Sequence, residues 1–295
     1  MVANETREVI GLAVASGVLC MCVYAFYKHF FAPETRPKGL NPREYQKYKL
    51  TKITEINHNT KIFRFALQTP TTILGLPTGN HISFRYFDDN NDEIRRPYTP
   101  ITSNDDKGYF DMLIKIYEHG KMTQHLNSLK LGNFIQARGP MGKIEYDAPG
   151  HFIVKKGKEK LPFNVSNVNL ICGGTGITPM LQLIRQIIKD DNDDTKVKMI
   201  FGNVSKNDIL LYDELKDLRS KNANIKIRFT IDKKDTNDNT WNESVGYVTN
   251  DMINEFLFKP NDKPATFLCG PPVMVKILQK TLNNMGYPDD KILKF

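Results

Sequence analysis

The sequence predicts an antiparallel β-barrel domain, followed by a Rossmann-like α/β domain with a parallel sheet, behind one apolar N-terminal helix. Between residues 45 and 155, apolar and polar residues alternate in short segments, as half-buried strands require. From residue 156 to 295, compact apolar segments alternate with amphipathic helices, which predicts a parallel sheet covered on both faces. Residues 1–44 hold the apolar run and a proline-containing tether.

The N-terminal run covers residues 9–27 and contains one Ser, no charged residue and no Pro. That length is enough to cross the hydrocarbon core of a membrane as a helix. A cleaved signal peptide and a buried helix of a soluble domain are the alternatives. Glu5, Arg7 and Glu8 precede the run, and cations follow it at Lys28, Arg36, Lys38 and Arg43. The positive-inside rule then predicts a single-pass anchor with the C-terminal body in the cytosol.

Composition excludes several classes of site. The 295 residues include only four cysteines, without a Cys-x-x-Cys pair or a Cys/His cluster: Cys20, Cys22, Cys172 and Cys269. This pattern argues against a disulfide framework, structural zinc and an iron–sulfur cluster, so we predict no metal. The net charge of +8 suits anionic lipid or an acidic protein. We predict no nucleic-acid binding, because no basic run with interleaved aromatics is present.

In the first domain, strands are predicted at residues 48–53, 61–67, 81–87, 109–117 and 134–137, with a short helix at 122–129. Turn residues separate these strands, which favours a sandwich or barrel. Residues two apart share a strand face, so Leu113, Lys115 and Tyr117 are expected to point the same way.

In the second domain, strands are predicted at residues 168–172, 197–201, 225–231 and 265–269. Helices are predicted to begin at Thr178, which can act as an N-cap before Pro179, and at residues 208, 250 and 272. The change from one domain to the other is expected within the polar stretch around residues 150–166.

One stretch suits a nucleotide: Arg96-Pro97-Tyr98-Thr99-Pro100. The prolines hold the segment extended, Arg96 offers a planar fork for phosphate, and Tyr98 offers an aromatic face. An edge strand that ends in a proline turn, with Arg96 solvated, is the alternative.

Two glycine-containing turns follow apolar strands, at residues 173–180 and 269–274. Glycine lets the backbone approach a phosphate, and a helix N-terminus adds a positive dipole. The first turn could also be only a tight strand–helix connection, and Cys269 only a small buried residue. Because no His or Lys adjoins Cys269, we do not predict thiol catalysis. Asp232 follows a third strand, where a carboxylate can bind a ribose 2′-hydroxyl, although Lys233 and Lys234 could instead accept a phosphate.

The stretches at residues 96–100, 173–180 and 269–274, in this order, resemble the ferredoxin–NADP reductase superfamily of flavoproteins. Within that superfamily they resemble the NADH–cytochrome b5 reductases. The resemblance runs from about Tyr45 to Phe295. It implies FAD and NADH as cofactors, with Thr178 touching both rings and Cys269 aiding nicotinamide docking; these two are the candidate catalytic residues. It also favours NADH over NADPH at Asp232. The implied cofactor-binding residues are Arg96, Pro97, Tyr98, Thr99, Leu113, Ile114, Lys115, Tyr117, Gly120, Lys121, Met122, Thr123, Gly173, Gly174, Thr175, Gly176, Thr178, Pro179, Asp232, Cys269, Gly270, Pro271, Met274 and Phe295.

The implied activity is hydride transfer from NADH to FAD, followed by single-electron delivery to cytochrome b5. The lack of paired carboxylates or a Ser/His/Asp arrangement is consistent, because the cofactors carry this chemistry. The same chemistry with a quinone, a ferric chelate or another haem protein as acceptor stays open, and so does a non-enzymatic tethered scaffold. The resemblance further implies a monomer on the endoplasmic reticulum or the mitochondrial outer membrane.

Overall fold

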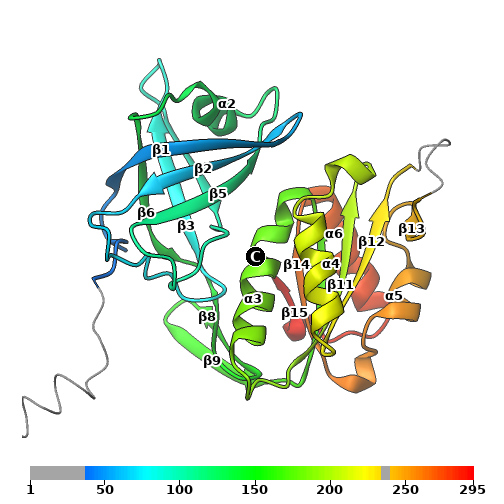
Figure 1. Cartoon of the computed structure of the whole chain (residues 1–295). Helices are drawn as coiled ribbons and strands as arrows, with labels where there is room; N and C mark the ends of the chain where they lie inside the picture. The colour runs from blue at the N-terminus through cyan, green and yellow to red at the C-terminus, as the bar shows by residue number, and fades with distance from the viewer. Residues whose placement is uncertain (1–36, 234–239) are drawn as a thin grey trace, which may run out of the picture. The chain divides into compact units, whose positions relative to one another are not determined.

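An antiparallel lobe and a parallel lobe follow one another along the chain (Figure 1). The computed structural model describes residues 37–233 and 240–295, and residues 38–295 form one compact unit. The predicted membrane helix at residues 9–27 lies outside the described residues. Within residues 37–233 and 240–295, no helix has both the length and the apolar character that a membrane span needs.

The first lobe is a six-stranded antiparallel sheet in the order β4-β3-β6-β1-β2-β5. Its end strands β4 and β5 share no ladder among the described residues, so the predicted barrel is an antiparallel sheet with two ends. Large buried aromatic side chains fill its core. The elements are β1 (Gln46–Asn57), β2 (Thr60–Ala66), β3 (His81–Phe87), β4 (Glu93–Tyr98), β5 (Tyr109–Lys115), α2 (Lys121–Ser128) and β6 (Phe134–Met141).

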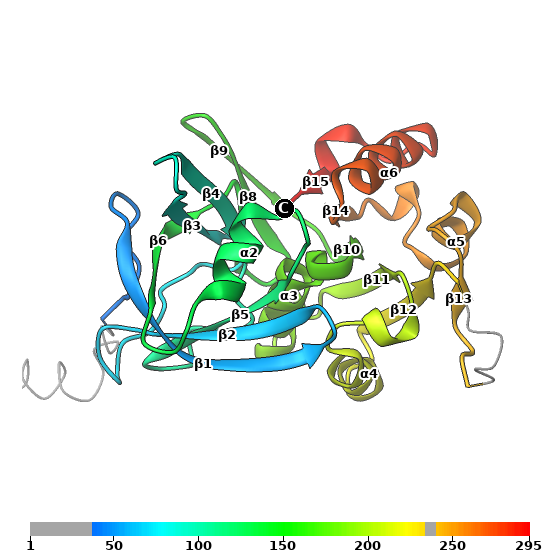
Figure 2. The same cartoon turned by 90° about the horizontal axis from the view of Figure 1, so that it is seen from above.

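The second lobe is a parallel sheet, as predicted, and its strand order is β13-β12-β11-β10-β14-β15. Buried residues of α3 and α4 pack on one face of the sheet, and those of α5 and α6 pack on the other (Figure 2). The elements are β10 (Asn167–Gly173), α3 (Ile177–Lys189), β11 (Lys196–Asn203), α4 (Tyr212–Lys221), β12 (Ile225–Ile231), β13 (Ser244–Val245), α5 (Asn250–Phe256), β14 (Ala265–Cys269), α6 (Pro272–Asn284) and β15 (Ile292–Lys294).

The predicted helix start at Thr178 is wrong. A 3₁₀ turn at Gly174–Gly176 runs directly into α3, so the chain is already helical at its N-cap, Gly176. Thr178 lies within the first turn, where its hydroxyl donates to the carbonyl oxygen of Thr175 at 3.1 Å. The start predicted at residue 208 is also early, because α4 begins at Tyr212.

A third, small sheet was not predicted. It is formed by β7 (Ile144–Ala148), β8 (His151–Lys156) and β9 (Glu159–Asn164), and it occupies the stretch where we expected the change of domain. The outer strand β9 is exposed at nearly every position, so it has no apolar alternation to detect. The polar sequence around residues 155–160 is therefore a solvent-facing hairpin.

Candidate functional site

The two glycine turns lie side by side at the carboxyl edge of the parallel sheet. They follow β10 and β14, which are adjacent and pair Cys172 with Cys269. A Cβ atom on Gly176 would lie 2.3 Å from the carbonyl oxygen of Cys269, so only glycine permits this approach. Likewise, a Cβ atom on Gly173 would lie 2.8 Å from Sδ of Met274. The structure thus joins two motifs that are almost a hundred residues apart in sequence.

The first of these turns leaves backbone groups open for a ligand. Gly174 has φ of +54°, a conformation that favours glycine, and a Cβ atom there would meet open space. The α3 N-terminus that follows has no side-chain cap and no acidic residue in its first turn. A helix end of this kind suits an anionic group. Thr175 is half-buried beside Gly174, and Pro179 is buried within the first helical turn.

Strand β5 brings the antiparallel lobe to this turn, since it lies against the 3₁₀ turn Gly174–Gly176. Leu113 of β5 is buried in the same core as Ile177, whereas Ile114 points into the core of its own lobe. Nζ of Lys115 pairs with Asp208 across the lobes. Because β5 ends at Lys115, strand alternation does not orient Tyr117, whose side chain lies in the following loop and is exposed.

The proline-containing stretch forms β4 and the turn after it. Arg96 is exposed; its guanidinium donates to the carbonyl oxygen of Arg95 and makes no ion pair within the described part of the chain. Arg95, by contrast, pairs with Glu93. The Tyr98 ring packs against Phe84 with centroids 5.3 Å apart. Burial raises the pKa of Tyr98 to about 12, so its hydroxyl stays protonated at neutral pH.

Helix α2 packs against β4 and presents a second uncapped N-terminus. Its N-cap is Gly120, and its first turn has no acidic residue. Lys121 pairs with Asp88 at 3.0 Å, and Met122 is buried in the core. The Thr123 hydroxyl donates to the Gly120 carbonyl oxygen at 3.0 Å and accepts from the Tyr117 amide at 3.1 Å, so it closes the preceding loop.

These donors fit FAD by their chemistry. A guanidinium at Arg96 that makes no ion pair among the described residues, and an uncapped helix end beside β4, are groups of the kind that bind a pyrophosphate. Tyr98 supplies an apolar ring with a protonated hydroxyl. The second uncapped helix end, at α3, fits the phosphates of a second nucleotide.

Three further predicted residues lie at the same sheet edge. Asp232 directly follows β12; its amide donates to the Asn203 carbonyl oxygen at 2.9 Å. Burial, followed by the charge of Asp208, raises the pKa of Asp232. Burial raises the pKa of Cys269 to about 11, so its sulfur is a neutral thiol at neutral pH. The Phe295 ring stacks on Phe267 with centroids 5.3 Å apart. Gly270 and Pro271 continue the Cys269 turn into α6.

Two residues at the junction of the lobes were missed by the sequence analysis. Asp208, in a 3₁₀ turn after β11, pairs with Lys115 at a sequence separation of 93 residues. Arg185 of α3 donates to the carbonyl oxygen of Ile101, 84 residues away. Neither residue belongs to a local motif, so no pattern along the chain could single them out.

Comparison with known proteins agrees with this architecture. Residues 47–146 match the family model of the oxidoreductase FAD-binding domain, and residues 170–280 match that of the oxidoreductase NAD-binding domain. NADH-cytochrome b5 reductase 1 of Homo sapiens is 39% identical over 298 residues, covering 96% of this chain and 96% of that protein. The protein of the same name from Dictyostelium discoideum is 38% identical, covering 88% of this chain and 84% of that protein.

A solved structure has the same fold as this chain. The cytochrome b5 reductase domain of Ulva prolifera nitrate reductase superposes with a TM-score of 0.80 at 34% identity, covering 88% of this chain and all of that domain. The match extends over both lobes described above. This chain therefore belongs to the NADH–cytochrome b5 reductase family of FAD- and NAD-binding oxidoreductases.

Proposed function

We propose that this chain is an NADH–cytochrome b5 reductase, an FAD-dependent enzyme that takes a hydride from NADH and delivers single electrons to cytochrome b5. The observation that carries this proposal is the meeting of β5 with the Gly174–Gly176 turn, since it joins the FAD-binding and NAD-binding lobes. The names and coverage of the relatives agree with it.

The residues proposed to hold FAD come from β4, β5 and α2. Arg96 and the uncapped start of α2 bind the pyrophosphate, because Arg96 has a guanidinium without an ion pair among the described residues and the helix start offers backbone N–H donors without a side-chain cap. Tyr98 and Thr99 line the ribitol and ring, and Lys115 reaches the ring from the end of β5. These residues would hold FAD, which would supply acceptance of a hydride and release of single electrons when bound. The chain's own task is to orient the two rings and to exclude water between them.

The residues proposed to hold NADH come from the carboxyl edge of the parallel sheet. Gly174 lets the dinucleotide approach the backbone, and Thr178 and Cys269 flank the nicotinamide. The neutral thiol of Cys269 suits packing against an uncharged ring and does not act as a nucleophile. Asp232 binds the ribose 2′-hydroxyl and disfavours a 2′-phosphate through its negative charge.

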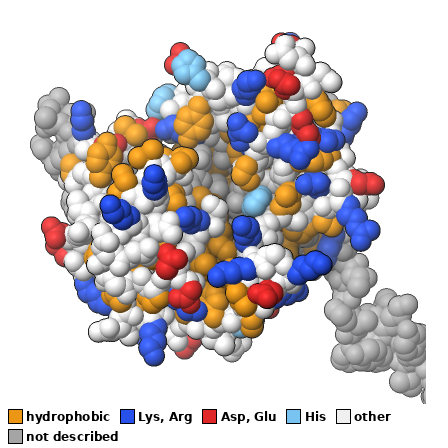
Figure 3. Space-filling model, turned by 180° about the vertical axis from the view of Figure 1, so that it is seen from behind, with side chains coloured by type: hydrophobic (Ala, Val, Ile, Leu, Met, Phe, Trp, Pro, Cys, Tyr) orange, Lys and Arg blue, Asp and Glu red, His pale blue; other side chains and the backbone are white. Residues whose placement is uncertain are grey.

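The acceptor is proposed to dock by charge. Lys and Arg side chains are spread over the face shown in Figure 3, interspersed with fewer acidic groups, and the chain carries a net charge of +8. An acidic haem protein would be attracted to such a surface, and its association would weaken with salt. We also propose that residues 9–27 anchor a monomer in the endoplasmic reticulum or mitochondrial outer membrane, with the body in the cytosol.

The test is anaerobic titration of the purified protein, followed by an acceptor panel. The protein should be yellow and should bleach with an equimolar amount of NADH. It should then reduce cytochrome b5 faster than a quinone, a ferric chelate or another haem protein at equal concentration. A colourless protein that cannot be reconstituted with FAD would refute the flavoenzyme. Faster reduction of another acceptor would refute only cytochrome b5 as the partner.

The membrane proposal has its own test. The full chain should sediment with vesicles after translation in their presence and resist extraction by alkali. A chain that lacks residues 1–36 should stay in the supernatant and keep its NADH-dependent flavin reduction. Equal sedimentation of both chains would refute the anchor.

A further inference from the structure

Helix α3 is hydrogen-bonded to the main chain at the open end of the β3–β4 hairpin. These bonds involve residues that are not among the proposed cofactor contacts. The side chain of Gln182 accepts a hydrogen bond from the Gly79 amide at 2.8 Å. One turn further along α3, Nη1 of Arg185 donates to the carbonyl oxygen of Ile101. On the hairpin side, the donor is the Gly79 amide and the acceptor is the Ile101 carbonyl oxygen. Because both are backbone groups, these bonds fix the position of the main chain.

Gly79 and Ile101 lie at the same end of that hairpin. In its register, Ile82 pairs with Tyr98 and Phe84 with Arg96. Gly79 lies three residues before Ile82 (82 − 79), and Ile101 lies three residues after Tyr98 (101 − 98). Helix α3 therefore bonds the segment before β3 and the segment after β4, just beyond the pair that includes Tyr98.

The same helix begins at the glycine turn. Thr178 and Arg185 are seven residues apart, which is about two turns of one helix. A two-turn helical segment moves as a rigid body on the scale of a side-chain contact. Arg185 consequently links the strand that carries Arg96 and Tyr98 to the helix end that carries Thr178.

Arg185 is itself held in place by α4. Its Nε donates to Oε1 of Glu214 at 3.0 Å, while Nη1 is directed to Ile101. The two side chains are 35% and 34% exposed, so neither is freely solvated. A planar guanidinium can satisfy both partners at once, whereas a lysine ammonium lacks that fixed fork.

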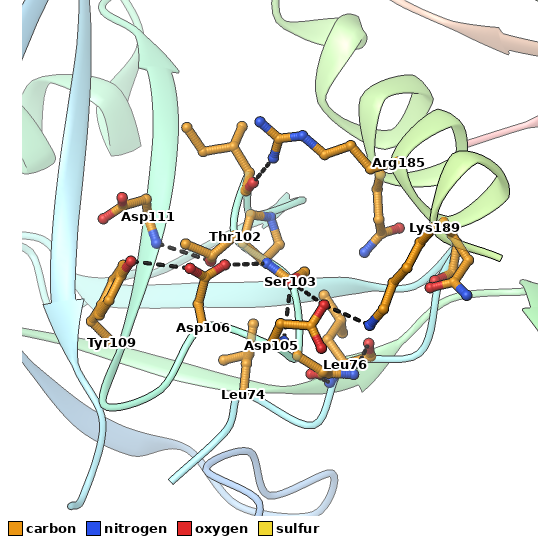
Figure 4. Close-up of a pocket in the computed structure, with 16 residues that line it drawn as sticks. Leu74, Leu76, Thr102, Ser103, Asp105, Asp106, Tyr109, Asp111, Arg185 and Lys189 are labelled. Carbon is orange, nitrogen blue, oxygen red and sulfur yellow. Dashed lines mark hydrogen bonds and ion pairs between the residues drawn. The ribbon is translucent and has the colours of Figure 1, made fainter. Parts of the chain in front are cut away.

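The surroundings of Arg185 make this bond important for the geometry of the lobes. A cavity of about 500 Å³ separates α3 from the loop after β4 (Figure 4). Its polar lining is bonded internally: Asp111 pairs with Arg64, Asp106 accepts from Tyr109, and Lys189 pairs with Asp105. At this level the lobes are joined by these polar bonds together with the apolar contact of Ile101 against the core that includes α3.

We propose that Arg185 is a positioning residue for hydride transfer, which sets the approach of the two cofactor rings by fixing the segment after β4, at Ile101, to helix α3. This inference rests on the proposed function. Reaction between two bound rings depends steeply on their separation, and a displacement of about 1 Å can cost a hundredfold in rate. Loss of the bond should therefore slow the chemical step more than it weakens binding of either cofactor.

The experiment compares Arg185→Ala and Arg185→Lys with Lys189→Ala. Lys189 is the matched control, because it lies one turn later on α3 and also bridges the lobes, but through an exposed pair with Asp105. Stopped-flow absorbance under anaerobic conditions gives the limiting rate of flavin reduction and the apparent Kd for NADH. FAD content and Tm are measured on the same samples.

For Arg185→Ala we expect a limiting rate reduced about tenfold or more, with FAD content and NADH Kd within about twofold of wild type. Arg185→Lys should fall between Ala and wild type, and Lys189→Ala should match wild type. If Arg185→Ala does not fold, Arg185→Lys decides, and a wild-type rate for it overturns the proposal. A limiting rate for Arg185→Ala equal to that of Lys189→Ala would also overturn the proposal. If NADH fails to reduce the flavin of the wild type, the proposed function is refuted and this inference with it.

Discussion

Nζ of Lys115, the last residue of β5, lies 3.3 Å from Oδ1 of Asp208, in the turn after β11. Only 19% of the Lys115 side chain and 12% of the Asp208 side chain are exposed. Burial acts to raise the pKa of Asp208, but the Ser205 hydroxyl and the Lys115 charge together outweigh it, so the pKa is lowered overall. The pair therefore links the antiparallel lobe to the parallel lobe next to the glycine turns.

We expect Asp208→Asn to destabilise the protein at neutral pH by on the order of 1–3 kcal/mol, because Lys115 is left partly buried without its counter-charge. A carboxyl with a lowered folded pKa stabilises the fold above its unfolded pKa of about 3.9, and the contribution is lost as pH falls through the folded value. The Tm gap between wild type and Asp208→Asn should hence shrink below about pH 4. A gap that stays constant through the acid range would contradict this role for the Asp208 charge.

Arg96→Ala should weaken FAD retention by about 1.5–3 kcal/mol, or roughly ten- to a hundredfold in Kd, because a charge-assisted contact to phosphate is lost. Fluorescence titration of deflavinated protein with FAD measures this change. Arg95→Ala is the matched control, since Arg95 is the neighbouring exposed cation and pairs with Glu93. Equal FAD affinity for Arg96→Ala and wild type would remove Arg96 from the flavin site.

Asp232→Ala should narrow the preference for NADH over NADPH by about tenfold, equivalent to about 1.4 kcal/mol. The main chain of Asp232 is fixed at the end of β12 by the hydrogen bond from its amide to the Asn203 carbonyl oxygen. A 2′-phosphate bound there would be repelled by the negative charge of the Asp232 carboxylate. The ratio of kcat/KM for the two dinucleotides is the measurement. Lys233→Ala, a change at the next residue, should move the ratio the other way if that cation attracts the phosphate. An unchanged ratio for Asp232→Ala would assign the preference to other residues.

The lobes could be predicted from sequence because their patterns are local. β3, β12 and β14 have the predicted bounds, since each alternates or runs apolar between clear turn residues. Parallel strands place both glycine turns at one edge of the sheet, but the adjacency of β10 and β14, which brings the turns side by side, was not predicted from sequence. The predicted features depend on contacts that the repeating geometry of strands already determines.

Other features depend on tertiary contacts and had no local signal. Strand β9 was not predicted, because neither face of that strand is buried and its sequence shows no apolar alternation. The N-cap of α3 is Gly176 and not the predicted Thr178, because the 3₁₀ turn at Gly174–Gly176 leads directly into the helix. The Arg185 contact with Ile101 joins residues 84 apart and could be found only from the folded chain.

Cys269 should behave as an unreactive thiol at neutral pH. Burial raises its pKa to about 11, and only the thiolate attacks an alkylating reagent, so alkylation by iodoacetamide should rise about tenfold per pH unit up to that value. Peptide mass spectrometry separates Cys269 from the other cysteines and follows its modification against pH. Cys172 is an internal control, because burial raises its pKa as well and its side chain is fully enclosed. Half-maximal alkylation of Cys269 near about pH 8.5, the ordinary cysteine value, would show a reactive thiolate and would reopen nucleophilic chemistry at the nicotinamide site.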